Sequence, residues 1–274
     1  MQTLSQIKAM LASHGLHPKK RFGQNFLHDQ NQVRRIVEAA GVGPGDVVLE
    51  VGPGTGALSV ALLEAGVTLV AVEVDNDLAP ILREVYAPYG ARATLQLTDV
   101  LADKHTIHPD VLAALRTAGG AGAEAFTVVA NLPYNVASPL LVNLCVDHPA
   151  MARAIVMVQK EVADRLTAGP GGKDYGPLGI LVQATCRAER LFTLSPGNFW
   201  PAPSIDSAVV RLVRRDAPLA ADLGRFAELV HRLFQHRRKQ IGSTLGRDAA
   251  LPPGVTPTMR PEQLSLEQLA GLAG

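Results

Sequence analysis

Three glycines with a two-residue spacing lie at a predicted turn between a strand and a helix. In VLEVGPGTGALS, Gly52, Gly54 and Gly56 follow the apolar run 46–51. Glycine adopts positive φ and lets a ligand approach the backbone where a Cβ would clash. Glu73 ends the next apolar run, where a carboxylate can accept both hydroxyl hydrogens of a ribose. The pattern predicts a nucleoside-type cofactor at the carboxyl edge of a sheet.

The identity of that cofactor is less constrained. Nicotinamide, flavin and S-adenosylmethionine enzymes share the arrangement, and a plain strand-to-helix turn is the alternative without a ligand. Two details favour S-adenosylmethionine. GPGTG lacks the GxGxxG spacing of a dinucleotide site, and Pro53 stiffens the loop. Asp99 follows a third predicted strand and can accept a hydrogen bond from an adenine amino group, although alone it is more often a turn or cap residue.

Asn131, Leu132, Pro133 and Tyr134 follow a fourth predicted strand at the same edge. A purine amine is a weak nucleophile, and two acceptors for its N–H hydrogens favour a pyramidal, more nucleophilic nitrogen. The Asn131 side-chain oxygen and the Leu132 carbonyl can accept them, and stacking on Tyr134 contributes about 1–3 kcal/mol. The alternative is an X-Pro turn with a half-buried tyrosine. The position after the glycine turn indicates methyl transfer by alignment and electrostatics.

These residues need a sheet to hold them. Strands are predicted at 46–51, 68–74, 93–97, 126–130, 154–159 and 207–213, and helices at 29–41, 57–65, 77–85 and 138–145. Alternation of strands and helices indicates a parallel, doubly wound α/β sheet. Later helices are predicted at 222–245 and 261–272. We therefore expect an α/β domain over 1–215 and a small all-helical domain over 216–274.

Composition excludes several classes of protein. The 274 residues are 47% hydrophobic and 19% charged, enough for a large core. Cys145 and Cys186 form no CxxC pair, so we expect neither a metal site nor a disulfide scaffold. We see no apolar run typical of a membrane span and no secretory signal at the N-terminus. We expect a soluble, cytoplasmic monomer.

The small net charge of +1 hides a division along the chain. Residues 1–40 carry +4, residues 41–186 carry −7, residues 187–247 carry +6 and residues 248–274 carry −2. Separate surfaces for a cofactor and a polyanion would produce this division, and chance clustering on a solvated surface is the alternative.

Over nearly its whole length the chain resembles the ribosomal RNA adenine N6,N6-dimethyltransferases, in particular the bacterial small-subunit (16S) group known from kasugamycin resistance. The segments that carry the resemblance are KKRFGQNFL (19–27), VLEVGPGTGALS (48–59), NLPYNVASPL (131–140), VQKEVADRLTAGPGGKDYGPLGIL (158–181), NFWPAPSIDSAVVRL (198–212) and FQHRRKQIGSTLG (234–246). The resemblance implies a Rossmann-like class I methyltransferase domain that uses S-adenosylmethionine. It also implies transfer of methyl groups to N6 of two adjacent adenosines in the 3′-terminal hairpin loop of 16S rRNA, within a 30S assembly intermediate.

The resemblance also implies roles for single residues. Cofactor contacts are expected from Asn25, Leu27, Gly52, Glu73, Asp99 and Asn131, in addition to Gly54 of the glycine turn. The target base is expected between Tyr134 and Phe199. From the residues alone, NFWPAP could instead be a proline-bracketed loop whose Phe199 and Trp200 cover the core.

Basic residues near both ends of the chain are expected to contact RNA phosphates. They are Lys19, Lys20 and Arg21, with Arg237, Arg238 and Lys239 on the predicted helix 222–245. A solvated helix face is the alternative for the second group. The chain departs from the family here, with Gly242 and Ser243 where a basic residue and Asn are frequent.

Two other functions compete with a small-subunit dimethyltransferase. One is a large-subunit (23S) rRNA adenine N6-methyltransferase that confers macrolide resistance, which the NLPYN form and the long C-terminal match disfavour. The other is a ribosome-assembly factor that binds precursor RNA and whose methylation is incidental. The same site would serve both roles, so the sequence leaves the assembly role open.

Overall fold

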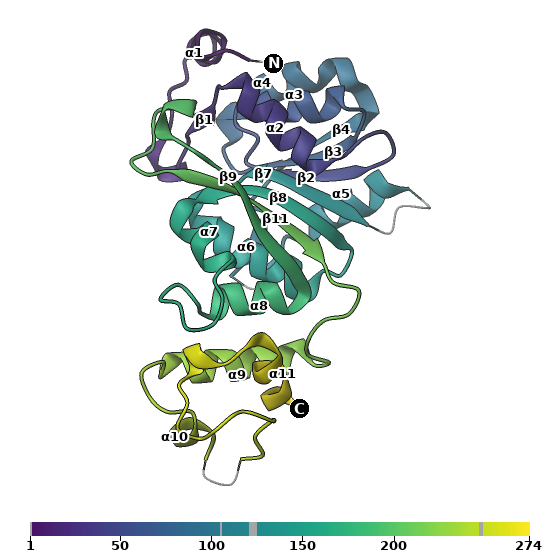
Figure 1. The fold of residues 1–274 in the computed structure, drawn as a ribbon. Helices are drawn as coiled ribbons and strands as arrows, with labels where there is room; N and C mark the ends of the chain where they lie inside the picture. Colours follow the sequence, from purple (N-terminus) through teal and green to yellow (C-terminus); the bar gives the residue numbers. More distant parts are fainter. Residues whose placement is uncertain (1, 105, 121–124, 247–248) are drawn as a thin grey trace.

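A mixed seven-stranded sheet forms the centre of the computed structural model, which describes residues 2–104, 106–120, 125–246 and 249–274 (Figure 1). In spatial order its strands are β4 (Ala93–Leu97), β3 (Thr68–Glu73), β2 (Val47–Val51), β7 (Phe126–Asn131), β8 (Met151–Gln159), β11 (Ser207–Arg214) and β9 (Cys186–Leu194). The first five are parallel, as predicted, and β11 is antiparallel to both of its neighbours.

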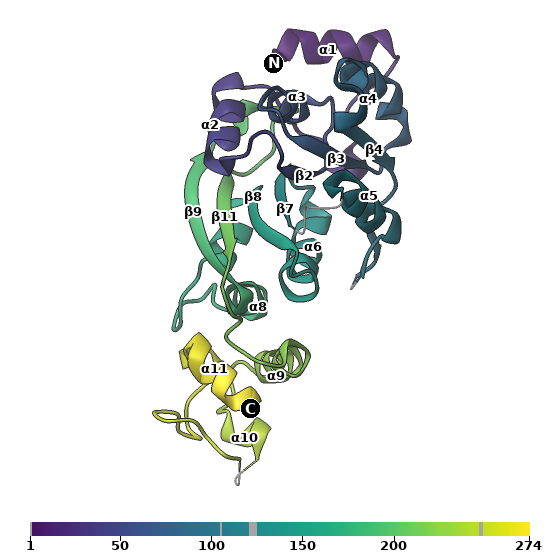
Figure 2. The same cartoon turned by 90° about the vertical axis from the view of Figure 1, so that its right-hand side faces the viewer.

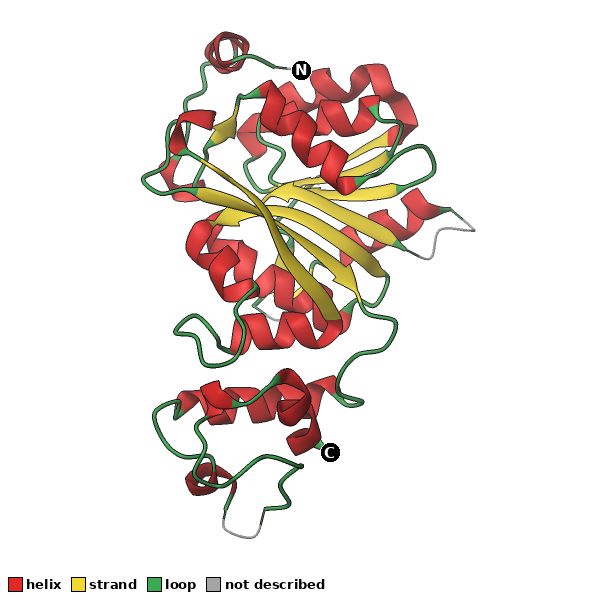
Figure 3. Ribbon diagram, in the orientation of Figure 1, coloured by secondary structure: helices red, strands yellow, loops and turns green. Residues whose placement is uncertain are grey.

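Helices cover both faces of the sheet (Figures 2 and 3). On one face lie α1 (Leu4–Ser13), α2 (Gln30–Ala40), α3 (Ala57–Glu64) and α4 (Ala79–Tyr86), and on the other lie α5 (Pro109–Gly119), α6 (Tyr134–Asp147), α7 (Lys160–Leu166) and α8 (Pro177–Thr185). The alternation of side chains along a strand produces this division. Val47, Leu49 and Val51 of β2 face the second layer, whereas Val48 faces the first.

Short elements complete the chain. The 3₁₀ turns are η1 (Lys20–Phe22), η2 (Asn76–Leu78), η3 (Ala87–Arg92), η4 (Pro196–Asn198) and η5 (Pro261–Gln263). Two small antiparallel sheets pair β1 (Phe26–Leu27) with β10 (Phe199–Trp200) and β5 (Leu101–Asp103) with β6 (Thr106–Ile107). The β1–β10 pair joins segments that are far apart in the sequence.

Some elements were missed by the sequence patterns. The predicted α/β order contained no strand at β9, because charged residues at 187, 189 and 190 interrupt its apolar pattern and this strand lies at the exposed edge of the sheet. Residues 111–125, which are rich in Ala and Gly, overlap α5, and 121–124 among them lie outside the described residues. The glycine-rich segment before α8, residues 168–176, contains a fully buried residue, Tyr175. The Tyr175 hydroxyl donates to the Leu264 carbonyl (3.0 Å).

The single helix predicted at 222–245 is wrong. α9 (Leu223–Gln235) ends before the basic run, and a separate short helix, α10 (Gly242–Leu245), follows a turn. The N–H groups of Ile241 and Gly242 donate to the carbonyls of Met259 (2.8 Å) and Pro257 (2.9 Å). These tertiary hydrogen bonds draw the chain away from the axis of α9, and neither could be inferred from periodicity.

The last helix also begins later than predicted. α11 (Leu266–Ala273) starts after Ser265, whose side chain accepts the Gln268 N–H while Gln268 reaches back to the Ser265 N–H. Such a reciprocal cap sets the first turn of a helix. The buried side chains of α9 and α11 pack with Ile180 and Leu181 of α8, so their apolar core includes residues before 215. The division at 215 stays a prediction.

Arg214, at the end of β11, ties the sheet to the end of α6. Its guanidinium donates to four backbone carbonyls at 2.8–3.0 Å, those of Leu144, Cys145, His148 and Met151. Because the last carbonyls of a helix have no intrahelical partner, the hydrogen bonds to Leu144 and Cys145 satisfy acceptors at the end of α6. The Arg214 side chain therefore caps the C-terminal end of α6.

We expect Arg214→Met to lower the free energy of unfolding by about 2–4 kcal/mol, because partly buried carbonyls lose charged donors. Arg211→Met on the same strand is the matched control. Arg211 pairs with Glu189 at the surface, so its loss should cost less than about 1 kcal/mol. Urea denaturation of both variants checks this, and equal losses would contradict the role assigned to Arg214.

Candidate active site

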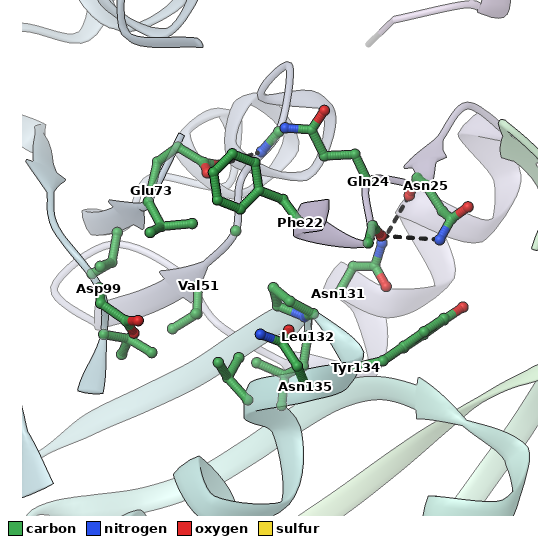
Figure 4. A pocket seen from close by; sticks show the side chains of 18 of the residues that line it. Phe22, Gln24, Asn25, Val51, Glu73, Asp99, Asn131, Leu132, Tyr134 and Asn135 are labelled. Atoms are coloured by element: carbon green, nitrogen blue, oxygen red, sulfur yellow. Dashed lines mark hydrogen bonds between the residues drawn. The ribbon is translucent and has the colours of Figure 1, made fainter. Parts of the chain in front are cut away.

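A cavity of about 240 Å³ lies at the carboxyl ends of β2, β3, β4 and β7 (Figure 4). In parallel strands these ends meet at one edge of the sheet, where α/β proteins bind ligands. Eight of the residues predicted to contact the cofactor or the target base line it: Asn25, Gly52, Gly54, Glu73, Asp99, Asn131, Leu132 and Tyr134. The structure therefore joins five separate sequence segments around one space.

The glycine turn is held between two hydrophobic side chains. Gly52, Gly54 and Gly56 have φ values of 70°, 61° and 84°, which L side chains rarely adopt. A Cβ on Gly52 would lie 3.1 Å from the Pro133 ring, and one on Gly54 would lie 2.9 Å from the Phe26 ring. Glycine is required here both by the backbone and by the close packing of the turn.

Glu73 ends β3 as a buried carboxylate with both oxygens directed by the backbone. Its Oε1 accepts the Asp75 N–H (2.9 Å) and its Oε2 accepts the Gly54 N–H (3.4 Å). Burial raises the pKa of Glu73, while these N–H donors act in the opposite direction. A carboxylate oriented in this way at the cavity wall can accept further hydrogen bonds from paired hydroxyls.

Asp99 fits both of the interpretations that its position allowed. Its Oδ1 accepts the Leu101 N–H (3.0 Å), so the residue shapes the turn after β4. The residue is exposed and lines the cavity at the side opposite Tyr134 (Figure 4). A turn residue of this kind presents an acceptor at a defined place.

The Asn131–Tyr134 tetrad forms the other side of the cavity. The Asn131 Nδ2 donates to the Asn25 carbonyl (3.3 Å), which leaves the amide oxygen as the atom that can accept an N–H. The Leu132 N–H donates to the Met157 carbonyl (3.0 Å) and anchors the turn to β8. Tyr134 is half-buried and is the first residue of α6, directly after Pro133. These contacts hold the tetrad without filling the space in front of it.

Two of the residues predicted to contact the cofactor or the target base lie outside the lining of this cavity. Leu27 and Phe199 face each other across β1 and β10 and are 6% and 3% exposed. Leu27 lines an adjoining cavity of about 40 Å³ beneath the glycine turn. Phe199 packs in the core beside the half-buried Trp200, as the proline-bracketed-loop interpretation expected. Its stacking role stays a prediction.

The six predicted RNA contacts divide into two groups. Lys20, Arg21, Arg238 and Lys239 are exposed. Lys19 instead lies against the carboxylates of Asp75 and Asp77, and Arg237 donates to the carbonyls of Gly172 (2.9 Å) and Lys173 (2.8 Å). The three residues expected on a helix, Arg237 to Lys239, lie instead in the turn after α9.

Sequence reasoning missed Glu50, a carboxyl group beneath the glycine turn. It is 2% exposed, lines the smaller cavity and accepts a hydrogen bond from Ser59 Oγ (2.6 Å), which also contacts the Tyr86 hydroxyl (2.9 Å). Burial raises the pKa of Glu50 to about 8. The signal was a single charged residue inside the otherwise apolar run VVLEV (47–51).

Gln2 is a second residue near the glycine turn that the sequence pattern does not indicate. Its side-chain amide donates to the Thr55 carbonyl (2.6 Å) and accepts the Thr55 hydroxyl (2.7 Å), so the start of the chain reaches the glycine turn. Nothing in the local pattern around Gln2 pointed to a partner 53 residues away. Among the described residues, no three His, Cys, Asp or Glu side chains form a metal-binding group, and no helix is long and apolar enough to cross a membrane.

Comparison with known proteins gives consistent matches. A family model described as ribosomal RNA adenine dimethylase matches residues 15–272. The ribosomal RNA small subunit methyltransferase A of Bifidobacterium longum (strain NCC 2705) is 42% identical over 286 residues, which cover 98% of this chain and 91% of that protein. Both matches include the glycine turn, the tetrad and the C-terminal helices.

Solved structures share the fold. A dimethyladenosine transferase from Plasmodium falciparum superposes with a TM-score of 0.74 and 22% identity, covering 90% of this chain and 95% of that chain. The 23S rRNA methyltransferase ErmE superposes with a TM-score of 0.68 and 27% identity, covering 91% and 98%. The α/β methyltransferase fold expected from the sequence is confirmed.

We expect Glu50→Gln to remove a pH dependence from the free energy of unfolding. Folded Glu50 keeps its proton up to about pH 8, whereas in the unfolded chain it releases the proton near its ordinary pKa of 4.5. The contribution of Glu50 to the free energy of unfolding is therefore fully present below its pKa in the unfolded chain. This contribution is lost as the pH rises through the pKa of Glu50 in the folded chain, by up to about 1.4 kcal/mol per pH unit.

Urea denaturation between about pH 5 and pH 8 measures this effect. The stability of the Gln variant relative to the unchanged chain should rise with pH across that range. Parallel pH profiles for the two proteins would contradict a protonated Glu50. Glu64→Gln, on the following helix and at an exposed position, should leave the profile unchanged.

Proposed function

The chain belongs to the ribosomal RNA adenine dimethylase family, and from this premise we propose that it methylates N6 of two adjacent adenosines in the 3′-terminal hairpin loop of 16S rRNA. The chain is an rRNA adenine dimethyltransferase with the α/β methyltransferase fold. The observation that carries the proposal is the single cavity lined by both Glu73 and the Asn131–Tyr134 tetrad. It combines a nucleoside-binding carboxylate with acceptors for an amine.

The cavity residues fit S-adenosylmethionine. Gly52 and Gly54 form a glycine turn with positive φ in the cavity wall, Glu73 is a buried carboxylate at the end of β3, and Asp99 is an acceptor at the far side. We propose that Glu73 binds the ribose hydroxyls, Asp99 the adenine amino group, and Asn25 the amino-acid end. When bound, the cofactor supplies an electrophilic methyl group on a sulfonium.

The tetrad would align the substrate amine. The Asn131 amide oxygen and the Leu132 carbonyl accept its two N–H hydrogens, which localises the nitrogen lone pair toward the cofactor side of the cavity. Tyr134 stacks on the adenine ring and, if the region around β10 adjusts, Phe199 covers the other face. The residues act by orientation and electrostatics, which can supply several kcal/mol.

The RNA would approach the mouth of this cavity. Arg21 lies in its lining and packs over the Phe22 ring at 4.6 Å, so its charge is held at the cavity wall. Lys20, Arg238 and Lys239 are exposed cations for further phosphates. We propose a small-subunit assembly intermediate as the natural substrate, bound by one copy of this chain.

Two observations bear on the competing functions. The chain is more similar to the small-subunit methyltransferase than to ErmE, which favours 16S over 23S rRNA. The presence of Glu73, Asp99 and the Asn131–Tyr134 tetrad in one lining favours methyl transfer over RNA binding alone. An assembly role in addition to catalysis would use the same surfaces.

Methyl transfer from labelled S-adenosylmethionine to undermethylated ribosomal subunits tests the proposal. We expect N6,N6-dimethyladenosine, identified by nucleoside mass spectrometry, in the 3′ hairpin of small-subunit RNA. Product in large-subunit RNA would move the function to the macrolide-resistance group. Tight RNA binding without transfer to either subunit would make the assembly role primary.

We expect Tyr134→Ala to lower kcat roughly 5- to 100-fold, the range that a lost base–aromatic stack predicts, with little change in the Kd of S-adenosylmethionine. Tyr134→Phe keeps the ring and should retain most of the activity. Steady-state kinetics and cofactor titration on the same preparations check this. Equal losses of turnover and cofactor affinity in Tyr134→Ala would count against the stacking role.

A further inference from the structure

Residues 19–25 form one wall of the cofactor cavity and have little regular structure of their own. Five of them, from Arg21 to Asn25, line the cavity, and their regular backbone structure is the single 3₁₀ turn η1. At the C-terminal end the wall continues into β1, which is paired with β10. Its N-terminal end is held by side chains instead.

Those side chains converge on Asp75, two residues after Glu73. Asp75 Oδ1 accepts the Lys19 ammonium (2.6 Å) and Oδ2 accepts the Gln24 amide (2.8 Å). The Gln24 Oε1 accepts the Lys19 N–H (2.8 Å), and the Lys19 ammonium also contacts Asp77. The three residues Lys19, Gln24 and Asp75 close a ring of hydrogen bonds, which we call the Asp75 clasp.

The Asp75 clasp is connected directly to the proposed ribose carboxylate. The Asp75 N–H donates to Glu73 Oε1 (2.9 Å), so the residue that fastens the wall also orients Glu73. One residue therefore links the position of the wall to the position of a cofactor ligand.

Burial makes these contacts strong. The Asp75 side chain is 4% exposed and that of Lys19 is 23% exposed, so solvent screens this ion pair less than a surface pair. Removal of one partner leaves a buried charge without compensation, which costs far more than the loss of a surface pair. The neighbouring charges are Glu73, Asp77 and Arg21, and Lys19 is the cation in contact with both Asp75 and Asp77.

We propose that Asp75 is a positioning residue for cofactor binding: through Lys19 and Gln24 it holds residues 19–25 against the cavity, and through its N–H it orients Glu73. This inference rests on the proposed use of S-adenosylmethionine. It assigns Lys19 to the cofactor site, where its charge is neutralised by two carboxylates, and it removes Lys19 from the predicted RNA surface.

An exchange of donor and acceptor tests the contact between positions 24 and 75. Gln24→Glu places a carboxylate against Asp75, and Asp75→Asn removes the charge that holds Lys19. In the double variant Gln24→Glu/Asp75→Asn, the amide and the carboxylate change places, which restores a hydrogen bond of the same length and geometry. A merely structural loss of packing would not be rescued in this way.

Titration of the full chain with S-adenosylmethionine and with S-adenosylhomocysteine provides the readout. We expect each single variant to lower the affinity for both ligands roughly tenfold, mainly through faster dissociation. The double variant should recover at least half of that loss of affinity on a logarithmic scale. The KM for the cofactor should rise accordingly. The kcat at saturating cofactor should change less than about twofold, because the clasp acts through the binding of the ligand.

Lys19→Met and its neighbour Lys20→Met form the matched pair. Lys19→Met should weaken the binding of the cofactor. Lys20→Met, at an exposed position, should leave the dissociation of the cofactor unchanged and weaken the binding of RNA. Unchanged cofactor affinity in Gln24→Glu, Asp75→Asn and Lys19→Met overturns the inference. So does a loss that the double variant fails to recover. If the unsubstituted chain binds neither ligand, the proposed cofactor itself fails, which is a separate outcome.

Discussion

Parallel pairing of β4, β3, β2 and β7 is the constraint on which the site depends. It brings the ends of four strands to one edge, so that Gly52, Glu73, Asp99 and Asn131 meet although they span about 80 residues. Each strand end leaves backbone groups without a ladder partner, and the turns that follow use them to hold side chains. The Gly54 and Asp75 N–H groups on Glu73 are examples.

The concentration of carboxyl groups at this edge requires compensation. Glu50, Glu73 and Asp75 are all buried, and each is accommodated differently. Burial raises the pKa of Glu50, which accepts the Ser59 hydroxyl, Glu73 receives backbone donors, and Asp75 is paired with Lys19. These contacts explain how the acidic segment 41–186 can form a compact site. They also explain why Lys19, a cation of the basic N-terminal segment, is paired within that site.

The C-terminal helices extend the α/β unit through shared packing. Their apolar side chains share a core with α8, and Tyr175 in the preceding glycine-rich segment donates to a carbonyl in the same region. Arg237 binds two carbonyls of that segment, so part of the basic run maintains this contact. Of the six cations predicted to bind RNA, the four exposed ones remain for a polyanion.

The local sequence determined the features that depend on neighbouring residues: the apolar strands, the glycines with positive φ, and the order of strand, turn and helix. It therefore predicted the carboxyl edge and seven of the lining residues, and the family resemblance added Asn25. Tertiary contacts decided the rest. The end of α9 depends on hydrogen bonds to 257–259, the burial of Phe199 on pairing with β1, and the partner of Lys19 on a carboxylate 56 residues away. Such contacts join segments that the chain brings together only when folded, and a lysine has the same local pattern whether it faces phosphate or a buried aspartate.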